Sequence, residues 1–252
     1  MNRTILVSGA GSGIGRAISQ ELADDGHSVL LLGRNRQTLA ETQAMLKDPS
    51  KHPIMTADVT DSQSLKAALQ EVSPVLYGVV ANAGLGGENH YGEADRWHEI
   101  VATNLTGTYQ LVHEALPYFA TKEDSFRHIV IISSVLARLG VPGYSAYCAS
   151  KAGLLGLMRS WAVEFAAEKI LVNALCPGWV NTQMATQGLE TFAKASGKTY
   201  REIYQEQMND VLLGKMSEPD EIARLTNFLM SPTQTSITGQ TIDINNGAVM
   251  PA

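Results

Sequence analysis

The 252-residue sequence has few of the features that mark a secreted, metal-binding or membrane-spanning protein. Its two cysteines, Cys148 and Cys176, lie in no C-x-x-C motif or Cys/His cluster, so we expect neither a disulfide framework nor a metal site. No apolar stretch reaches the roughly 18 residues that a membrane span needs. A strand pattern begins within the first residues and leaves no room for a signal peptide. Together these absences indicate a cytoplasmic protein that does not enter a membrane.

Basic residues are also scarce. Lysine and arginine number 19 against 25 aspartates and glutamates, giving a formal net charge of −6, and they form no basic run. Such a chain is poorly suited to bind the phosphate backbone of a nucleic acid. Hydrophobic residues make up 44% of the sequence and charged residues 17%, which is typical of a globular domain.

Apolar runs of strand length alternate with longer segments of helical periodicity. The runs are rich in Val, Ile and Leu without polar alternation, which indicates strands buried on both faces, as in a parallel sheet. We expect strands at Thr4–Ser8, Ser28–Gly33, 53–57, 75–81, 128–133, 170–175 and Thr241–Ile244. We expect helices at 14–25, 36–47, 62–72, 94–120, 146–168 and 218–230. This order predicts a doubly wound α/β fold, with residues 1–252 in a single domain.

One long segment, residues 183–216, contains no strand pattern. Residues 186–195 and 199–209 each fit a short helix. A connection of this length in a compact domain is usually a functional lid or disordered, and we interpret it as a substrate lid. The helix that follows has Ser217 as its expected N-cap and Pro219 in its first turn.

A glycine-rich turn links the first expected strand to the first helix. Gly9, Gly13 and Gly15 have the spacing G-x-x-x-G-x-G, while Ile14 occupies the third glycine position of the other common spacing, G-x-G-x-x-G. Backbone N–H groups at such a turn bind pyrophosphate, and glycine lets the phosphates approach closely. The position of the motif favours nucleotide binding over a glycine turn without a ligand.

The end of the second strand indicates which dinucleotide binds. An acidic residue there would accept hydrogen bonds from the adenosine ribose of NAD(H), but this chain has Arg34 at that point. The planar guanidinium of Arg34 suits a 2′-phosphate, so the sequence predicts NADP(H) rather than NAD(H). The alternative is an exposed arginine at a strand end.

Two further strand ends carry polar side chains. Asp58, after the third strand, either hydrogen-bonds the adenine amino group or caps the following turn. Asn82-Ala83-Gly84 ends the fourth strand, where we expect the Asn82 side chain to tie neighbouring strands together.

Tyr147 and Lys151 lie four residues apart in a helical pattern and therefore share a helix face. A phenol has a reference pKa near ~10, and a neighbouring ammonium favours its ionised form. We therefore expect Lys151 to lower the pKa of Tyr147 and the pair to carry out acid–base catalysis. A surface pair without a function is the alternative.

The order and spacing of these motifs resemble the short-chain dehydrogenase/reductase family along nearly the whole chain. The matching residues are Gly9, Gly13, Gly15, Asn82, Ala83, Gly84, Asn104, Ser134, Tyr147, Lys151, Pro177 and Gly178. The resemblance implies a Rossmann fold with a parallel sheet of strand order 3-2-1-4-5-6-7 and helices on both faces. It also implies hydride transfer between a nicotinamide and a carbonyl or secondary alcohol without a metal.

The resemblance also implies a role for each catalytic residue. Tyr147 would protonate the carbonyl oxygen, and Ser134 would hydrogen-bond and polarise it. Lys151 would hold the ribose hydroxyls of the nicotinamide half. Asn104 would bend its helix, and its backbone carbonyl would place a water that feeds protons to Lys151.

By the same resemblance, the turn from Pro177 to Thr182 would lie against one face of the nicotinamide, with Val180 and Thr182 binding the carboxamide or a phosphate. The expected cofactor contacts are thus Gly9, Ser12, Gly13, Ile14, Gly15, Arg34, Asp58, Val59, Asn82, Ala83, Gly84, Tyr147, Lys151, Pro177, Gly178, Val180 and Thr182.

Substrate selection is expected in residues 136–144, 84–91 and the lid. The expected pocket wall consists of Leu136, Val141, Tyr144, Trp179 and Met184. These residues are apolar or aromatic, which favours an uncharged small-molecule ketone. The lid also carries Lys194, Lys198 and Arg201, so a 3-oxoacyl thioester carried by acyl-carrier protein or coenzyme A is the main alternative.

Two other classes are weighed against a reductase. A non-catalytic NADP(H)-sensing regulator tends to lose the tyrosine or lysine, and this chain keeps both. A sugar-nucleotide epimerase shares Y-x-x-x-K but usually has a longer C-terminal substrate region. The resemblance further implies a homotetramer, or a homodimer, formed through residues 104–120 and 146–168.

Overall fold

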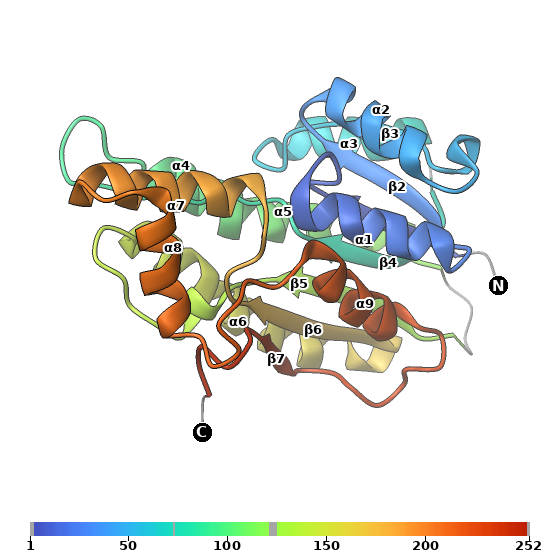
Figure 1. Ribbon diagram of the computed structural model, residues 1–252. Coiled ribbons are helices and arrows are strands. Elements are labelled where there is room, and N and C mark those ends of the chain that lie inside the picture. Colours follow the sequence, from blue (N-terminus) through green and yellow to red (C-terminus); the bar gives the residue numbers. More distant parts are fainter. Residues whose placement is uncertain (1–2, 73, 121–124, 251–252) are drawn as a thin grey trace.

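The computed structural model describes residues 3–72, 74–120 and 125–250, which form a single domain around one seven-stranded sheet (Figure 1). The strands are β1 (Thr4–Ser8), β2 (Ser28–Gly33), β3 (Ile54–Thr56), β4 (Leu76–Ala81), β5 (Arg127–Ile132), β6 (Ile170–Pro177) and β7 (Thr241–Ile244). Each pairs with its neighbours in parallel, in the order β3-β2-β1-β4-β5-β6-β7. The predicted fold class and strand order are confirmed.

The sheet is buried on both faces because its central strands carry apolar side chains in both directions. Successive residues of a strand point to opposite faces. Accordingly, Leu6 and Val79 pack into the core layer on one face, whereas Val7 and Val80 pack into the layer on the other. The apolar runs of the sequence are unbroken because both faces of these strands are buried.

Helices cover both faces. α1 (Gly13–Asp24), α2 (Arg36–Met45) and α9 (Pro219–Met230) contribute Ile18, Leu39 and Ile222 to one core layer. On the opposite face lie α3 (Ser62–Val72), α5 (Gly107–Ala115) and α6 (Ser145–Glu164). Within the part of the chain that the structure describes, none of the helices has both the length and the apolar character needed to cross a bilayer.

The helix predicted at 94–120 is interrupted in the structure. α4 (Trp97–Val101) passes into a π-helical turn, Ala102–Thr106, before α5 begins, and a 3-10 turn, Leu116–Tyr118, follows α5. Asn104 lies in the middle of the π turn, and its side chain bonds the backbone of Leu85 rather than facing solvent. The expected bend at Asn104 is therefore present.

The segment 183–216 contains two helices, α7 (Gln183–Ser196) and α8 (Tyr200–Asn209), close to the predicted ones. They share a small apolar core that includes Leu189, Ile203 and Met208, separate from the layers on the sheet. In Figure 1 both helices project beyond the carboxyl ends of the strands.

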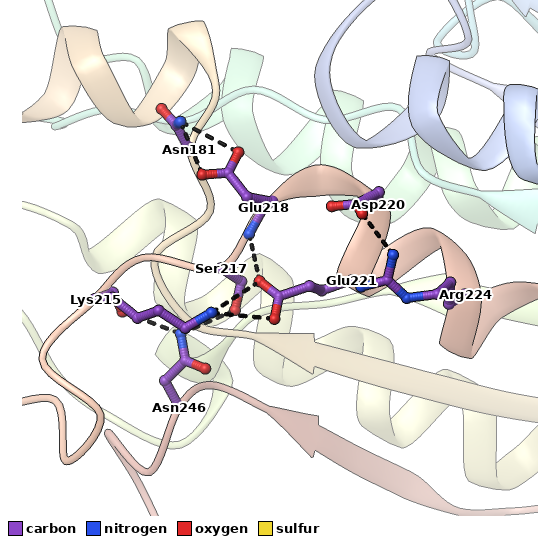
Figure 2. A network of polar contacts seen from close by, with 8 residues as sticks. All are labelled: Asn181, Lys215, Ser217, Glu218, Asp220, Glu221, Arg224 and Asn246. Atoms are coloured by element: carbon purple, nitrogen blue, oxygen red, sulfur yellow. Dashed lines mark hydrogen bonds and ion pairs between the residues drawn. The ribbon is translucent and has the colours of Figure 1, made fainter.

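The two ends of this segment are held together by polar contacts (Figure 2). The Asn181 N–H donates to the Ser217 carbonyl at 2.8 Å, and the Asn181 side chain donates to the Glu218 carboxylate at 3.1 Å. The Asn246 amide donates to the Lys215 carbonyl and the Ser217 hydroxyl. The start and the end of segment 183–216 are therefore bonded to each other where they join the rest of the domain.

The same contacts explain an error in the predicted start of α9. The N-cap is Glu218, not Ser217, and the Glu221 carboxylate accepts the Glu218 N–H at 2.6 Å. Ser217 is unsuitable as the cap because its backbone pairs with Trp179 and Asn181 and its hydroxyl bonds Asn246.

A buried basic group lies at the amino ends of the strands, opposite the glycine turn. His128, at the start of β5, is 1% exposed, and neither of its ring nitrogens has a hydrogen-bond partner among the described residues. Burial, together with the positive charge of Arg3, lowers the pKa of His128 to about 4. The pKa of His27 is lowered as well, chiefly by burial.

This group predicts a specific loss of stability in acid. The His128 ring of the unfolded chain binds a proton below pH ~6.5, whereas that of the folded chain stays neutral down to about pH 4. The free energy of unfolding should therefore fall by about 3 kcal/mol from His128 alone as the pH drops across this window. His128→Leu should flatten that part of the slope in urea titrations at several pH values. An unchanged slope would contradict the assignment.

Candidate active site

Loops from four neighbouring strands meet at the carboxyl edge of the sheet, the usual ligand site in this type of fold. They enclose a cavity of about 130 Å³, lined by Gly9, Gly33, Arg34, Ala57, Asp58, Val59, Ala83, Gly84, Leu85 and Thr103. Gly9, Arg34, Asp58, Val59, Ala83 and Gly84 were predicted cofactor contacts. Gly33, Ala57, Leu85 and Thr103 were not, although the first three directly adjoin predicted residues.

The glycine turn has a backbone geometry that favours glycine. Gly9 and Gly13 have φ values of +66° and +49°. A Cβ on Gly15 would lie 2.2 Å from the Gly9 carbonyl oxygen, so any side chain there would break the turn. A Cβ on Gly13 would lie 3.3 Å from Cγ2 of Thr182, which places the turn beside the Pro177–Thr182 loop. This small, backbone-lined cradle fits a dinucleotide pyrophosphate.

Asn82 ties strands together, as predicted. Its side-chain amide donates to the Ser8 carbonyl at 3.0 Å. The Ser8 hydroxyl in turn accepts the N–H groups of Asn82 and Ala83, each at 3.0 Å. These bonds join the ends of β1 and β4 beneath the cavity.

Arg34 and Asp58 face each other across the rim of the cavity, with Nη1 and Oδ2 separated by 3.7 Å. Asp58 also accepts the N–H and hydroxyl of Thr60, so it does cap the following turn. Burial raises the pKa of the Asp58 carboxyl, but the bonds from Thr60 and the charge of Arg34 outweigh it and leave the pKa lowered. The carboxylate is therefore ionised at neutral pH, while Arg34 remains 63% exposed on its side chain.

The three catalytic candidates Ser134, Tyr147 and Lys151 come together beyond the ends of β5 and β6. Tyr147 lies in the first turn of α6, and the Lys151 Nζ is 5.6 Å from the centroid of its ring. Lys151 is 5% exposed, and its amine donates to the Ile132 carbonyl at 2.9 Å. Ser134 follows β5 and caps a 3-10 turn by accepting the Leu136 N–H.

The predicted lowering of the Tyr147 pKa by Lys151 stays a prediction, and burial of the phenol acts against it. Burial raises the pKa of the Tyr147 phenol, and only the neighbouring Ser134 hydroxyl, which can bond the phenolate, acts strongly in the other direction. Burial also lowers the pKa of Lys151 to about 8.

Asn104 joins this group from the side. A Cβ on Gly84 would lie 3.2 Å from the Asn104 Oδ1 and 3.5 Å from the Lys151 Nζ, so all three residues meet. The Asn104 side chain also donates to the Ser150 hydroxyl at 3.1 Å, one residue before Lys151. The Asn104 backbone carbonyl accepts the Thr108 hydroxyl at 2.8 Å.

The sequence analysis missed an ion pair that supports the Ser134 turn. Arg138, at the end of that turn, makes two hydrogen bonds of 2.9 Å to Asp243 on β7. Asp243 lies opposite Cys176 in the sheet register, next to Pro177. No sequence pattern links residues 105 positions apart, so only the strand order reveals this contact.

Comparison with known proteins agrees with this geometry. Residues 9–249 match the family described as enoyl-(acyl carrier protein) reductase. A 3-oxoacyl-(acyl-carrier-protein) reductase FabG from Aggregatibacter actinomycetemcomitans is 32% identical over 254 residues, covering 98% of this chain and 99% of that protein. A FabG from Haemophilus influenzae is 33% identical over 247 residues, covering 96% of each.

A solved structure titled as a variant actinorhodin polyketide ketoreductase with NADPH superposes with a TM-score of 0.90. It shares 29% sequence identity, and the match covers 98% of this chain and 97% of that one. Fold, site and relatives define an NAD(P)-dependent oxidoreductase. The chain belongs to the short-chain dehydrogenase/reductase family.

Proposed function

We propose that this enzyme reduces a ketone to a secondary alcohol with NADPH, and that Tyr147 is the proton donor. The observation that carries the proposal is the meeting of Tyr147, Ser134 and Lys151 at the strand ends beside the nucleotide cavity. When bound, the cofactor supplies the hydride. Side chains and backbone groups of this chain would donate the proton, polarise the carbonyl and bind the cofactor.

The raised pKa of Tyr147 suits the reductive direction. At neutral pH the phenol keeps its proton and can give it to a carbonyl oxygen that gains negative charge. The Ser134 hydroxyl, next to the phenol, would donate to the same oxygen. Alcohol oxidation requires the phenolate instead, so it should become more favourable as the pH rises.

Lys151 and Asn104 would resupply the proton. Lys151, with a pKa of about 8, can exchange a proton near neutral pH. The Asn104 carbonyl has a second lone pair besides the one that accepts the Thr108 hydroxyl. A water on that lone pair would connect the Lys151 amine to solvent.

The cofactor would lie across the whole carboxyl edge. The glycine turn, with Ser12 and Ile14, would hold the pyrophosphate, and Val180 and Thr182 would hold the nicotinamide carboxamide. Asp58, Val59 and Ala83 would line the adenosine slot. Arg34, which is exposed and only loosely paired with Asp58, would turn toward a 2′-phosphate and so favour NADP(H).

Segment 183–216 would act as the substrate lid. Tyr144 is the residue directly before α6, and the centroid of its ring lies 5.9 Å from that of Phe192 on α7. A Cβ on Gly86 would lie 2.9 Å from the Met184 sulfur, so the start of α7 also reaches the β4–α4 loop. Leu136 and Val141 lie shortly before Tyr144 in the sequence, and Trp179 lies shortly before Met184. The apolar character of these residues favours an uncharged substrate.

The curated relatives favour a narrower substrate. Several are named 3-oxoacyl-(acyl-carrier-protein) reductases, so a 3-oxoacyl thioester is the second candidate. The exposed Lys194 and Arg201 on the lid would attract an anionic carrier. Lys198 contributes less, since it pairs with Glu206 at 2.6 Å.

We also propose that the enzyme acts in the cytoplasm as a homotetramer or homodimer. Cys148 and Cys176 are free thiols, which suits a reducing compartment. An apolar groove on the outer side of α5 and α6 is lined by Leu105, Thr106, Tyr109, Gly153, Gly156, Leu157 and Ser160. A second copy of the chain would cover it.

Replacing Tyr147 tests the proposed mechanism. Tyr147→Phe removes the proton donor, so kcat should fall by about 10²- to 10⁴-fold. NADPH binding, followed by cofactor fluorescence, should change little. The assay is NADPH absorbance with a panel of ketones that includes a 3-oxoacyl thioester. Cys148→Ser, on the next residue, serves as the control and should keep turnover; full turnover by Tyr147→Phe would refute the mechanism.

Replacing Arg34 tests the cofactor preference. Arg34→Asp removes charge-assisted hydrogen bonds worth about 1.5–3 kcal/mol, so the ratio of kcat/KM for NADPH over NADH should drop by about 10- to 100-fold. Arg36→Asp makes the same charge change two residues away, outside the cavity lining, and should leave the ratio nearly unchanged. Equal efficiency with both cofactors in the wild-type enzyme would argue against the 2′-phosphate role.

Sedimentation velocity tests self-association. The molar mass obtained for the wild-type protein should be two or four times the 27.1 kDa mass of one chain. A Cβ on Gly156 meets no atom within 4 Å, so Gly156→Lys should fold normally but place a charge in the groove and weaken association. Gly140→Lys, on an equally open glycine outside the groove, is the control. A wild-type monomer would rule out the proposal.

A further inference from the structure

The catalytic helix lacks a capping side chain of its own. α6 begins after Tyr144, and Tyr144 makes no side-chain hydrogen bond to the first turn. The first N–H groups of a helix have no partner inside the helix and need one from outside. In α6 this turn contains Tyr147, so its geometry decides where the phenol lies.

The missing partner comes from another part of the chain. Asn89, in the loop between β4 and α4, is 6% exposed, and its Oδ1 accepts the Ala146 N–H at 2.9 Å. The Ser145 hydroxyl lies within hydrogen-bonding distance of both ends of the same amide, 3.2 Å from Oδ1 and 3.1 Å from Nδ2. The backbone N–H of Asn89 also donates to the Gly143 carbonyl at 2.7 Å. Asn89 therefore bonds the backbone both before and after Ser145, the first residue of α6.

The other end of the same amide reaches α4. The Asn89 Nδ2 donates to the Asp95 Oδ1 at 3.2 Å, and that oxygen also accepts the N–H of Trp97, the first residue of α4. One buried amide thus connects the starts of two helices, and the second leads through the π turn to Asn104. The carboxylate fixes the orientation of the amide, because only its nitrogen can donate to Asp95.

We propose that Asn89 is a positioning residue for Tyr147: its amide oxygen caps α6 from the β4–α4 loop and holds the phenol in place for proton transfer. The inference rests on the proposed function of Tyr147. Asn89 itself is not one of the residues that line the nucleotide cavity. Its effect is transmitted through the backbone of Ser145 and Ala146.

Asn89→Leu removes the cap at nearly constant volume. Amide hydrogen exchange in the peptide 145–150 should become faster, and kcat for ketone reduction should fall roughly tenfold, in line with the loss of one helix cap. The KM for NADPH should stay within about twofold, because the cofactor edge is untouched. The pH at which kcat declines should also shift, since the surroundings of the phenol change.

A reciprocal exchange provides the rescue. In the double variant N89D/D95N, the carboxylate introduced at position 89 can still accept the Ala146 N–H. The amide introduced at position 95 can turn its nitrogen toward that carboxylate, which restores the contact with residue 89 and gives up the Trp97 N–H bond that the same atom of Asp95 accepts in the wild type. The kcat of the double variant should return to within about threefold of wild type. N89D alone places two carboxylates at this 3.2 Å contact, so it should be slower than the double variant.

A matched control separates positioning from general loss of stability. Asn173, which is 1% exposed, donates to the Ile237 carbonyl at 2.8 Å and accepts the Gln240 N–H at 3.1 Å. Asn173→Leu should lower the melting temperature by a similar amount and leave kcat and its pH dependence unchanged. An equal loss of kcat in both leucine variants would overturn the proposal.

The remaining outcomes are also decisive. Faster exchange in Asn89→Leu with wild-type kcat would make Asn89 a structural cap only and overturn the positioning role. If Asn89→Leu does not fold, equal kcat values for N89D and N89D/D95N would overturn the positioning role instead. Full turnover by Tyr147→Phe would instead overturn the proposed function, and the positioning role with it.

Discussion

Two hydrogen bonds fix α6, which carries Tyr147 and Lys151, on the sheet, and the positions of the other candidate site residues depend on them. The Lys151 amine donates to the Ile132 carbonyl at the end of β5, and the Ser133 hydroxyl donates back to the Lys151 carbonyl, both at 2.9 Å. Because both bonds are buried, slipping the helix along the strand would leave polar groups without partners. This register places Tyr147, one turn earlier, beside the serine that follows the strand.

Burial also sets the chemistry of this arrangement. The environment that makes the bonds to Lys151 strong disfavours both an ionised phenol and a charged amine. The site therefore holds a protonated tyrosine next to a lysine that exchanges protons near neutral pH. Phe192 of α7 packs against Tyr144, and burial raises the pKa of Tyr144 to about 12, so the same dry environment continues to the start of α6.

Much of the fold followed from local patterns, because parallel strands buried on both faces produce long apolar runs and the glycine turn has a fixed place after β1. The predicted strands agree with the observed ones to within a residue or two. A bend at Asn104 was expected, but its π-helical form and the cap at Glu218 were not, since tertiary bonds to Leu85 and Asn246 decide them. The partnerships of Asn89 with Ala146 and of Arg138 with Asp243 likewise exist only once the strand order is known. The burial that acts on Tyr147 and Lys151 could not be predicted from their spacing, because sequence spacing carries no information about burial.

The Arg138–Asp243 pair has a consequence for how the enzyme is made. β7 lies at the edge of the sheet and pairs only with β6, so it can join the fold only after the preceding strands. A domain generally folds as a unit, so the serine turn is completed only once β7 has paired. A nascent chain has therefore synthesised its tyrosine and lysine almost a hundred residues before the aspartate that braces the serine turn. Reductase activity should consequently appear only after β7 has paired with β6, and not when Tyr147 and Lys151 are synthesised.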